Sequence, residues 1–167
     1  MSSLSGINNI KNGNSNKSGN VYVMLKIGNE FYAINVMKVT MISSITDFRS
    51  MPNSESYMAG IMNVQGEIIP VVDMRKKFGL AQLGFTKTTA VVIVNVRSDM
   101  AGLIVDSVAD VVTLDFSKIQ LKSTALSKRD SCITGAVEYR ENIILFLDPD
   151  EIVQEEVFEE VSNIDLS

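Results

Sequence analysis

The side chains with the greatest chemical potential in this sequence are four aspartates beside apolar runs: Asp73, Asp106, Asp110 and Asp148. A pair of such carboxylates could act as general acid and general base. The chain has 0 His, however, so it lacks the commonest general base near neutral pH and the commonest zinc ligand. Capping or turn roles fit the aspartates better, since two precede predicted helices and Asp106 directly follows a predicted strand. The pattern favours a protein without catalytic residues.

Other chemical motifs are equally scarce. The single cysteine, Cys132, cannot form an internal disulfide and is expected to be a small buried apolar residue. The sequence contains no glycine-rich phosphate loop, no paired-cysteine motif and no calcium-loop spacing of acidic residues. We therefore expect no cofactor and no metal.

Length and composition narrow the class of protein further. A chain of 167 residues suits one ordinary domain or two very small ones. Hydrophobic residues make up 46%, enough for a core, but no run is long enough for a membrane span and no secretory signal is recognised. We expect a soluble cytoplasmic protein without direct membrane insertion. A net charge of -5 disfavours binding to nucleic acid.

The first residues differ in composition from the rest. Of the first 20 residues, 14 are Ser, Asn or Gly, a composition that buries too little apolar surface to offset the entropy of ordering. Residues 1–19 are therefore predicted to be a disordered tail.

From Val21 onward, short β-branched and aromatic runs alternate with turn residues, which is typical of an all-β barrel or sandwich. Four hairpins are predicted, each consisting of two runs around a short turn. They span 21–36, 61–72, 90–105 and 136–147.

These hairpins indicate an internal duplication. Residues 21–42 align without a gap on 90–111, and residues 60–73 align on 135–148. Each half is then expected to form one small β-barrel. Because a unit of this size has a thin core, the two barrels should pack together along a hydrophobic seam.

Both halves end at an aspartate that can cap a helix. Asp148 is followed by proline at the first helical position, and Asp73 precedes a short helix that Gly79 closes. A C-terminal helix is also predicted, whose apolar stripe should dock on the barrels. The stripe consists of Val153, Val157, Val161 and Ile164.

Three segments resemble a known family. Residues 60–75 read Gly-Ile-Met-Asn-Val-Gln-Gly-Glu-Ile-Ile-Pro-Val-Val-Asp-Met-Arg, which is similar to a characteristic block of the CheW family of chemotaxis coupling proteins. Residues 102–111 resemble the second family block, and residues 30–34 resemble the first. The similarity extends in collinear order over about residues 20–153.

This resemblance implies a pair of five-stranded barrels within a CheW-like domain at 20–154, followed by a C-terminal helix or tail at 155–167. The first barrel is placed roughly at 36–86 and the second roughly at 20–35 plus 87–150. It also implies a non-catalytic cytoplasmic adaptor at membrane receptor arrays, monomeric outside them. Such an adaptor couples methyl-accepting chemoreceptors to the regulatory domain of the CheA histidine kinase.

By position, the resemblance places the receptor tip in a hydrophobic groove between the barrels. The residues assigned to that groove are Val36, Val39, Met41, Gly60, Asn63, Gln65, Gly66, Gly102, Val108 and Val111. The apolar run 36–42 supports a partner surface independently, because it carries more apolar residues than one face of a half-exposed strand needs.

Two positions depart from the family pattern. The family commonly has glutamate where this chain has Met41 and arginine where it has Gln65, two positions expected to lie close together. We hypothesise that a charged pair has been exchanged for a neutral contact, since losing both partners can be neutral where losing one is costly. A specialised CheW paralogue in a non-flagellar pathway is one alternative. A small β-barrel module for ligand or nucleic acid is another, although only 7% of residues are aromatic. An enzyme using Asp73 is a third.

Overall fold

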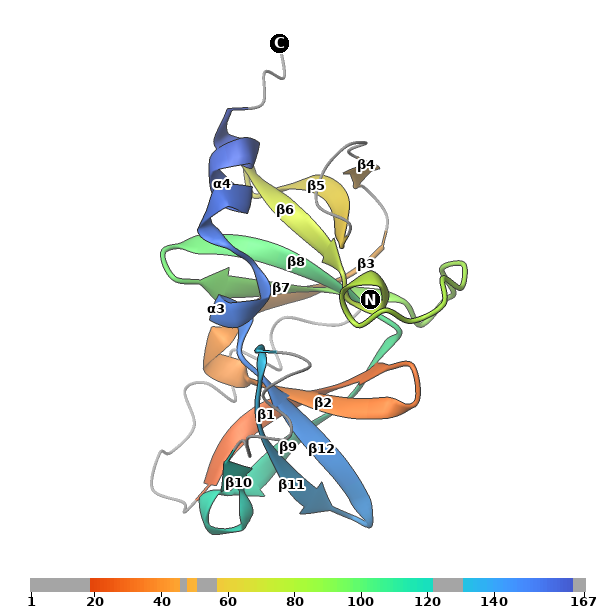
Figure 1. Ribbon diagram of the computed structural model, residues 1–167, viewed down its shortest axis with the longest axis vertical. Coiled ribbons are helices and arrows are strands. Elements are labelled where there is room, and N and C mark those ends of the chain that lie inside the picture. Colours follow the sequence, from red (N-terminus) through yellow and green to blue (C-terminus); the bar gives the residue numbers. More distant parts are fainter. Residues whose placement is uncertain (1–18, 46–47, 51–56, 122–130, 164–167) are drawn as a thin grey trace.

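The computed structural model describes residues 19–45, 48–50, 57–121 and 131–163 (Figure 1). Residues 1–18 of the predicted tail lie outside these ranges, while Gly19, also assigned to the tail, begins the first strand. The described chain is mostly β-strand with a few short helices, as the sequence predicts, and all four predicted hairpins are present.

The strands are β1 (Gly19–Ile27), β2 (Glu30–Asn35), β3 (Val39–Ser44), β4 (Arg49–Ser50), β5 (Met58–Val64), β6 (Glu67–Asp73), β7 (Ala90–Val96), β8 (Asp99–Val105), β9 (Ser107–Asp115), β10 (Gln120–Leu121), β11 (Ile133–Tyr139) and β12 (Asn142–Leu147). The helical segments are η1 (Val36–Lys38), α2 (Met74–Lys77), η2 (Phe116–Lys118), α3 (Pro149–Ile152) and α4 (Glu155–Ser162).

The strands form two six-stranded sheets, which lie one above the other in Figure 1. Sheet A has the order β10-β11-β12-β2-β1-β9, and sheet B has the order β4-β5-β6-β8-β7-β3. The two orders become identical when each strand is replaced by its counterpart in the other half of the chain. The chain passes between the sheets at η1, which leads from β2 to β3, and at Asp106, which leads from β8 to β9.

The hydrogen-bond registers repeat in the same way. In sheet B, β6 runs parallel to β8 with Val71 opposite Gly102, and in sheet A, β12 runs parallel to β2 with Phe146 opposite Ala33. These pairs are related by the offsets of the sequence alignment. The register shift between Val39 and Met41 also has its counterpart in β9. The topology therefore supports the predicted internal duplication.

Two details of the predicted fold are corrected. The five-stranded barrels are not confirmed, because each unit is a six-stranded sheet and the described pairings do not close either sheet. The approximate boundary near residue 86 also assigned β7 and β8 to the second unit, but β7 pairs with β3 and β8 pairs with β6. The first hairpin of each half thus joins the sheet formed by the other half: β1 and β2 pair with strands of the second half, and β7 and β8 pair with strands of the first. An alignment shows which strands correspond but not which sheet each one enters.

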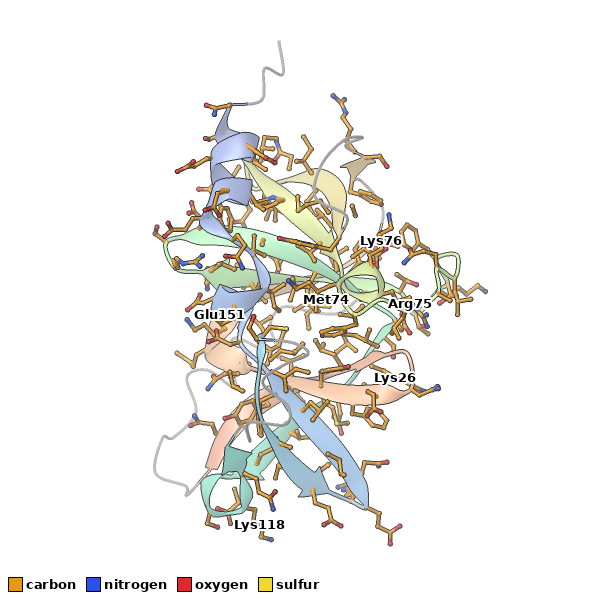
Figure 2. All side chains as sticks on the ribbon, viewed as in Figure 1. Lys26, Met74, Arg75, Lys76, Lys118 and Glu151 are labelled. Carbon is orange, nitrogen blue, oxygen red and sulfur yellow. The ribbon has the colours of Figure 1, made fainter. Side chains whose placement is uncertain are left out.

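The main core lies between the sheets, where side chains from both pack in one cluster. It includes Leu25 and Ile34 of sheet A together with Val72 and Leu103 of sheet B. Met74 of α2 is fully buried in this cluster, whereas Lys26 and Lys118 project outward (Figure 2). Each sheet has a second, smaller cluster on its other face. The shared hydrophobic seam is thus present, and side chains fill it.

Short helices close both halves as the capping residues predict. The Asp73 side chain accepts hydrogen bonds from the amides of Arg75 and Lys76, and the Asp148 side chain accepts one from the amide of Asp150. The C-terminal helix is divided, because the chain is extended at Val153 between α3 and α4.

The apolar stripe of the C-terminal segment docks as expected. Val157 and Val161 of α4 are buried, and α4 packs against β6. Val153 is buried but not helical, and Ile164 lies outside the described residues.

Candidate partner-binding surface

The ten residues predicted to contact a receptor fall into three levels of exposure. Four are buried: Val36, Val39, Gly60 and Gly102. Three are half-buried: Met41, Val108 and Val111. Three are exposed: Asn63, Gln65 and Gly66.

The structure brings some of these residues together at the seam. Val36 and Val39 belong to the core cluster between the sheets, and Val108 of β9 packs against that cluster. They come from the two segments that connect the sheets. Val111 follows on β9, opposite Val23 of β1.

Other members of the predicted set lie on the outer face of sheet B. Met41 packs against the smaller cluster on that face. Gly102 faces it too, because a Cβ there would approach Val91 Cγ1 to 2.9 Å. A larger side chain at position 102 would disturb packing, so this glycine has a structural role whether or not a partner lies above it.

The three exposed residues lie at the β5–β6 hairpin, with Asn63 near the end of β5 and Gln65 and Gly66 in the turn. The Asn63 side chain accepts a hydrogen bond of 3.0 Å from the Gly66 amide, and Gln65 and Gly66 have φ of 52° and 87°. Positive φ at both central residues is the geometry of a tight hairpin turn. Asn63 therefore shapes the turn, and Gln65 is presented at its tip.

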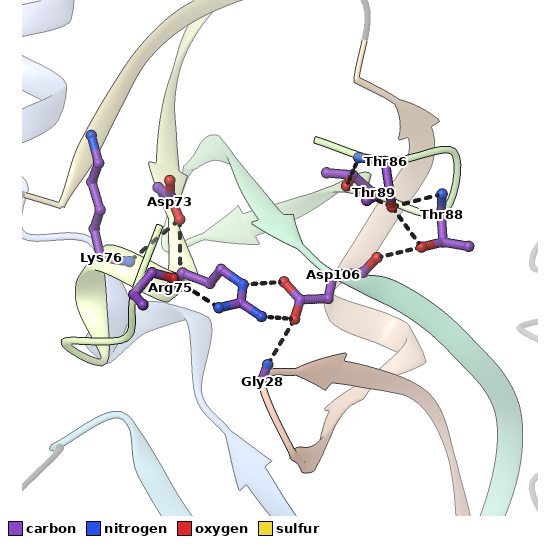
Figure 3. Close-up of polar contacts among 9 residues, drawn as sticks. Gly28, Asp73, Arg75, Lys76, Thr86, Thr88, Thr89 and Asp106 are labelled. Carbon is purple, nitrogen blue, oxygen red and sulfur yellow. Dashed lines mark hydrogen bonds and ion pairs between the residues drawn. The ribbon is translucent and has the colours of Figure 1, made fainter. Parts of the chain in front are cut away.

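Arg75 and Asp106 form a contact between the sheets that the sequence did not predict. Arg75 of α2 binds Asp106 through two parallel hydrogen bonds, Nε to Oδ1 at 2.8 Å and Nη2 to Oδ2 at 2.7 Å (Figure 3). The Gly28 amide also donates to Asp106 Oδ2 at 2.8 Å. Two parallel bonds between guanidinium and carboxylate are among the stronger polar contacts in proteins. The two residues lie in separate family blocks, and the alignment alone could not pair them.

The environment of Asp106 favours its charged form. Burial would raise the pKa of this carboxyl, but the hydrogen bonds from Arg75 and Gly28 and the positive charges of Arg75 and Lys26 outweigh it and lower the pKa. Hydrogen bonding to Asp106 likewise raises the pKa of Arg75. Asp106 is thus an ionised structural residue.

The remaining aspartates also have local roles. Asp73 and Asp148 cap helices as predicted, and Asp110 accepts a hydrogen bond of 2.8 Å from the amide of Val111. Cys132 is buried, as expected. Within the ranges that the structure describes, no group of three or more Cys, Asp or Glu residues could hold a metal ion.

The cleft nearest to the Arg75–Asp106 contact has a volume of about 310 Å³. Its lining includes Lys26, Phe85 and Asp106 but none of the ten predicted receptor-facing residues. It therefore does not correspond to the groove expected from the resemblance.

Comparison with known proteins identifies the family. The model of the CheW-like domain matches residues 21–157. The chemotaxis protein CheW of Klebsiella aerogenes is 26% identical over 147 residues, covering 87% of this chain and 89% of that protein. CheW of Bacillus subtilis is 28% identical over 141 residues, covering 84% of this chain and 90% of that protein.

Solved structures agree on the fold. The crystal structure of the scaffolding protein CheW from Thermoanaerobacter tengcongensis matches with a TM-score of 0.77 at 24% identity, covering 85% of this chain and 92% of that one. The solved structure shows that the two-sheet fold is that of a CheW protein, and the match of the domain model over residues 21–157 defines the class as CheW-like. This chain belongs to the CheW-like family, and it is a non-catalytic adaptor.

Proposed function

We propose that this chain couples chemoreceptors to the CheA histidine kinase by binding the receptor tip and the kinase regulatory domain at separate surfaces. The observation that carries the proposal is the match of the CheW-like domain over residues 21–157. Within the described residues, no helix is long and apolar enough to cross a membrane. In our proposal the adaptor is monomeric in the cytoplasm and joins receptor arrays through its partners.

The burial of the ten residues refines how the receptor would be contacted. Val108, Val111 and Met41 are half-buried, so part of each side chain is open to a partner. Val36 and Val39 belong to the core cluster against which Val108 packs, so they would support that part of the surface from beneath. Covering a few such aliphatic side chains contributes about 1.5 to 3 kcal/mol each before the cost of association is subtracted.

Met37 extends this surface beyond the predicted set. It is 63% exposed in η1, between the buried Val36 and the partly exposed Lys38. An exposed methionine is adaptable and suits a contact that forms and dissociates. We assign Met37 to the receptor-facing surface in place of the buried Val36.

Pull-down with a receptor cytoplasmic fragment and the kinase regulatory domain tests this function. The natural chain should retain both, and Val108→Asp should lose the receptor fragment. Ile143→Asp controls for the change of an apolar side chain to a charge at an exposed site, since Ile143 is 63% exposed on β12. Because Val108 packs against the core, retention of the kinase regulatory domain by Val108→Asp shows that this variant is folded. Retention of neither partner by the natural chain would refute the proposal.

A further inference from the structure

The receptor-facing part of β9 begins directly after the Arg75–Asp106 contact. Asp106 is the residue at which the chain leaves sheet B, and β9 starts at Ser107. Val108 therefore stands two residues beyond Asp106, and Val111 follows on the same strand. Any movement of Asp106 would shift the beginning of the partner-facing strand.

Both the side chain and the backbone of Asp106 are fixed. Its carboxylate binds the Arg75 guanidinium and the Gly28 amide. Its own amide donates to the Lys26 carbonyl at 3.0 Å, and its carbonyl accepts a hydrogen bond of 3.1 Å from Thr88 Oγ1 (Figure 3). Contacts from three separate segments thus hold one residue between the sheets.

Arg75 is itself held in place by its surroundings. Its amide donates to the Asp73 carboxylate at 3.0 Å, and its Nη1 donates to the Ala81 carbonyl at 2.9 Å. These contacts orient the guanidinium toward Asp106 independently of the ion pair. Since Asp73 ends β6, a continuous set of contacts runs from the middle of sheet B to the start of β9.

The chain also passes between the sheets at η1, and this second junction provides a comparison with the junction at Asp106. The position equivalent to Asp106 is Met37, and the position equivalent to Arg75 is Asp150. There the Arg97 amide donates to Asp150 Oδ1 at 2.9 Å, and Lys38 Nζ lies 3.4 Å from Asp150 Oδ2. At that junction the carboxylate is on the helix and its cation, Lys38, is on the connecting segment, where one contact between more exposed side chains holds η1 less firmly than Arg75 holds Asp106.

We propose that Arg75 and Asp106 are positioning residues for receptor binding: their ion pair fixes the start of β9 so that Val108 and Val111 meet the receptor in one arrangement. This inference rests on the proposed function. Neither residue needs to touch the receptor, because each acts through the strand that follows Asp106.

Affinity for a receptor cytoplasmic fragment, measured by calorimetry well below the unfolding temperature, tests this inference. Asp106→Asn and Arg75→Met should each weaken binding at least tenfold. Arg75→Lys should also weaken it, because an ammonium group cannot reproduce the two parallel bonds. Asp150→Asn is the matched control, since it alters a carboxylate that also accepts a turn amide and faces a cation, and it should change affinity by less than twofold.

A second measurement separates positioning from general stability. In NMR spectra of the free protein, the methyl signals of Val108 and Val111 should shift in Asp106→Asn and stay in place in Asp150→Asn. Unchanged affinity in folded Asp106→Asn, or in folded Arg75→Lys if Asp106→Asn does not fold, would overturn the inference. Equal losses in Asp106→Asn and Asp150→Asn would overturn it as well.

The outcome for Val108→Asp keeps the two claims distinct. If that variant still binds the receptor fragment, the proposed surface is wrong whatever the ion pair does. If Val108→Asp loses binding while the variants of Arg75 and Asp106 keep it, the surface stands and the positioning role fails.

Discussion

The two junctions between the sheets contain the same kinds of group, but the carboxylate and the cation have exchanged positions. In each, a hairpin-turn amide and a cation bind one carboxylate. At the first junction the carboxylate, Asp106, stands on the connecting segment and Arg75 on the helix. At the second the carboxylate, Asp150, stands on the helix and Lys38 on the connecting segment.

The strengths of these contacts also differ. The Arg75 and Asp106 side chains are 18% and 28% exposed and form two parallel bonds. The Lys38 and Asp150 side chains are 43% and 33% exposed and form one contact of 3.4 Å. Duplication has preserved backbone register while side-chain chemistry has diverged. One junction is thereby better suited to fix a strand than the other.

The largest difference between the halves is expected at two equivalent glycines. A Cβ at Gly60 would lie 1.9 Å from the Arg49 carbonyl oxygen, whereas a Cβ at Gly135 would lie 2.7 Å from the Gln120 carbonyl oxygen. Gly60→Ala should lower the free energy of unfolding by about 3 kcal/mol and Gly135→Ala by about 1 kcal/mol. Urea denaturation measures both. Equal losses would contradict this prediction, because they would mean that β4 and β10 move equally easily to admit the added methyl group.

Removing the cation from each junction should give the next largest difference. Arg75→Met leaves the partly buried Asp106 without its partner and should lower the free energy of unfolding by about 1 to 3 kcal/mol. Lys38→Met should cost about 0.5 kcal/mol or less, because that pair is more exposed. Thermal and urea unfolding test this. A larger loss from Lys38→Met would reverse the ranking of the junctions.

Acid should remove the contribution of the stronger junction. The pKa of Asp106 is lowered in the folded protein, so the ionised form stabilises the fold above the unfolded-state value, about 3.9. This contribution is lost as pH falls from about 5 through the folded-state pKa. Unfolding measured between pH 7 and pH 3 should therefore show the natural chain converging on Asp106→Asn. A constant difference over this range would contradict the assignment.

The smallest effect on stability is expected at the β5–β6 turn. Arg140 occupies the equivalent position in the other half with φ of 48°, close to the 52° of Gln65, so the backbone of this turn accommodates arginine. Gln65→Arg should change the free energy of unfolding by about 0.5 kcal/mol or less. It should weaken receptor binding, because the charge would have no glutamate partner at Met41.

The double variant Gln65→Arg with Met41→Glu completes this test. Binding should recover relative to Gln65→Arg alone if the two positions form a pair across the receptor-facing surface. Improvement of both stability and binding by Gln65→Arg alone would refute the idea that a neutral contact has replaced a charged one.

Local features of the fold were predictable because short-range chemistry determines them. The turn residues located the hairpins, and Asp73 and Asp148 precede helices because carboxylates accept hydrogen bonds from free amides. The gap-free alignment of the halves corresponds to equivalent registers in the two sheets. These inferences needed only neighbouring residues or the comparison of one segment with another.

Contacts between distant segments were not predictable in the same way. The hairpins β1–β2 and β7–β8 each join the sheet of the other half. This arrangement depends on pairing between strands far apart in the sequence, and such pairing leaves no local signal. For the same reason the partner of Asp106 was missed although Arg75 stood in a recognised block. The burial of Val36 and exposure of Met37 follow from the helical turn of η1, where an extended strand had been assumed.

The most direct test of the central claim is whether receptor and kinase bind this chain at the same time. Size-exclusion chromatography with light scattering can follow a mixture of the chain, a receptor cytoplasmic fragment and the kinase regulatory domain. One species containing all three proteins is expected, and it should lose only the receptor fragment when Val108→Asp replaces the natural chain. Mutual displacement of the two partners, so that no ternary species forms, would contradict it.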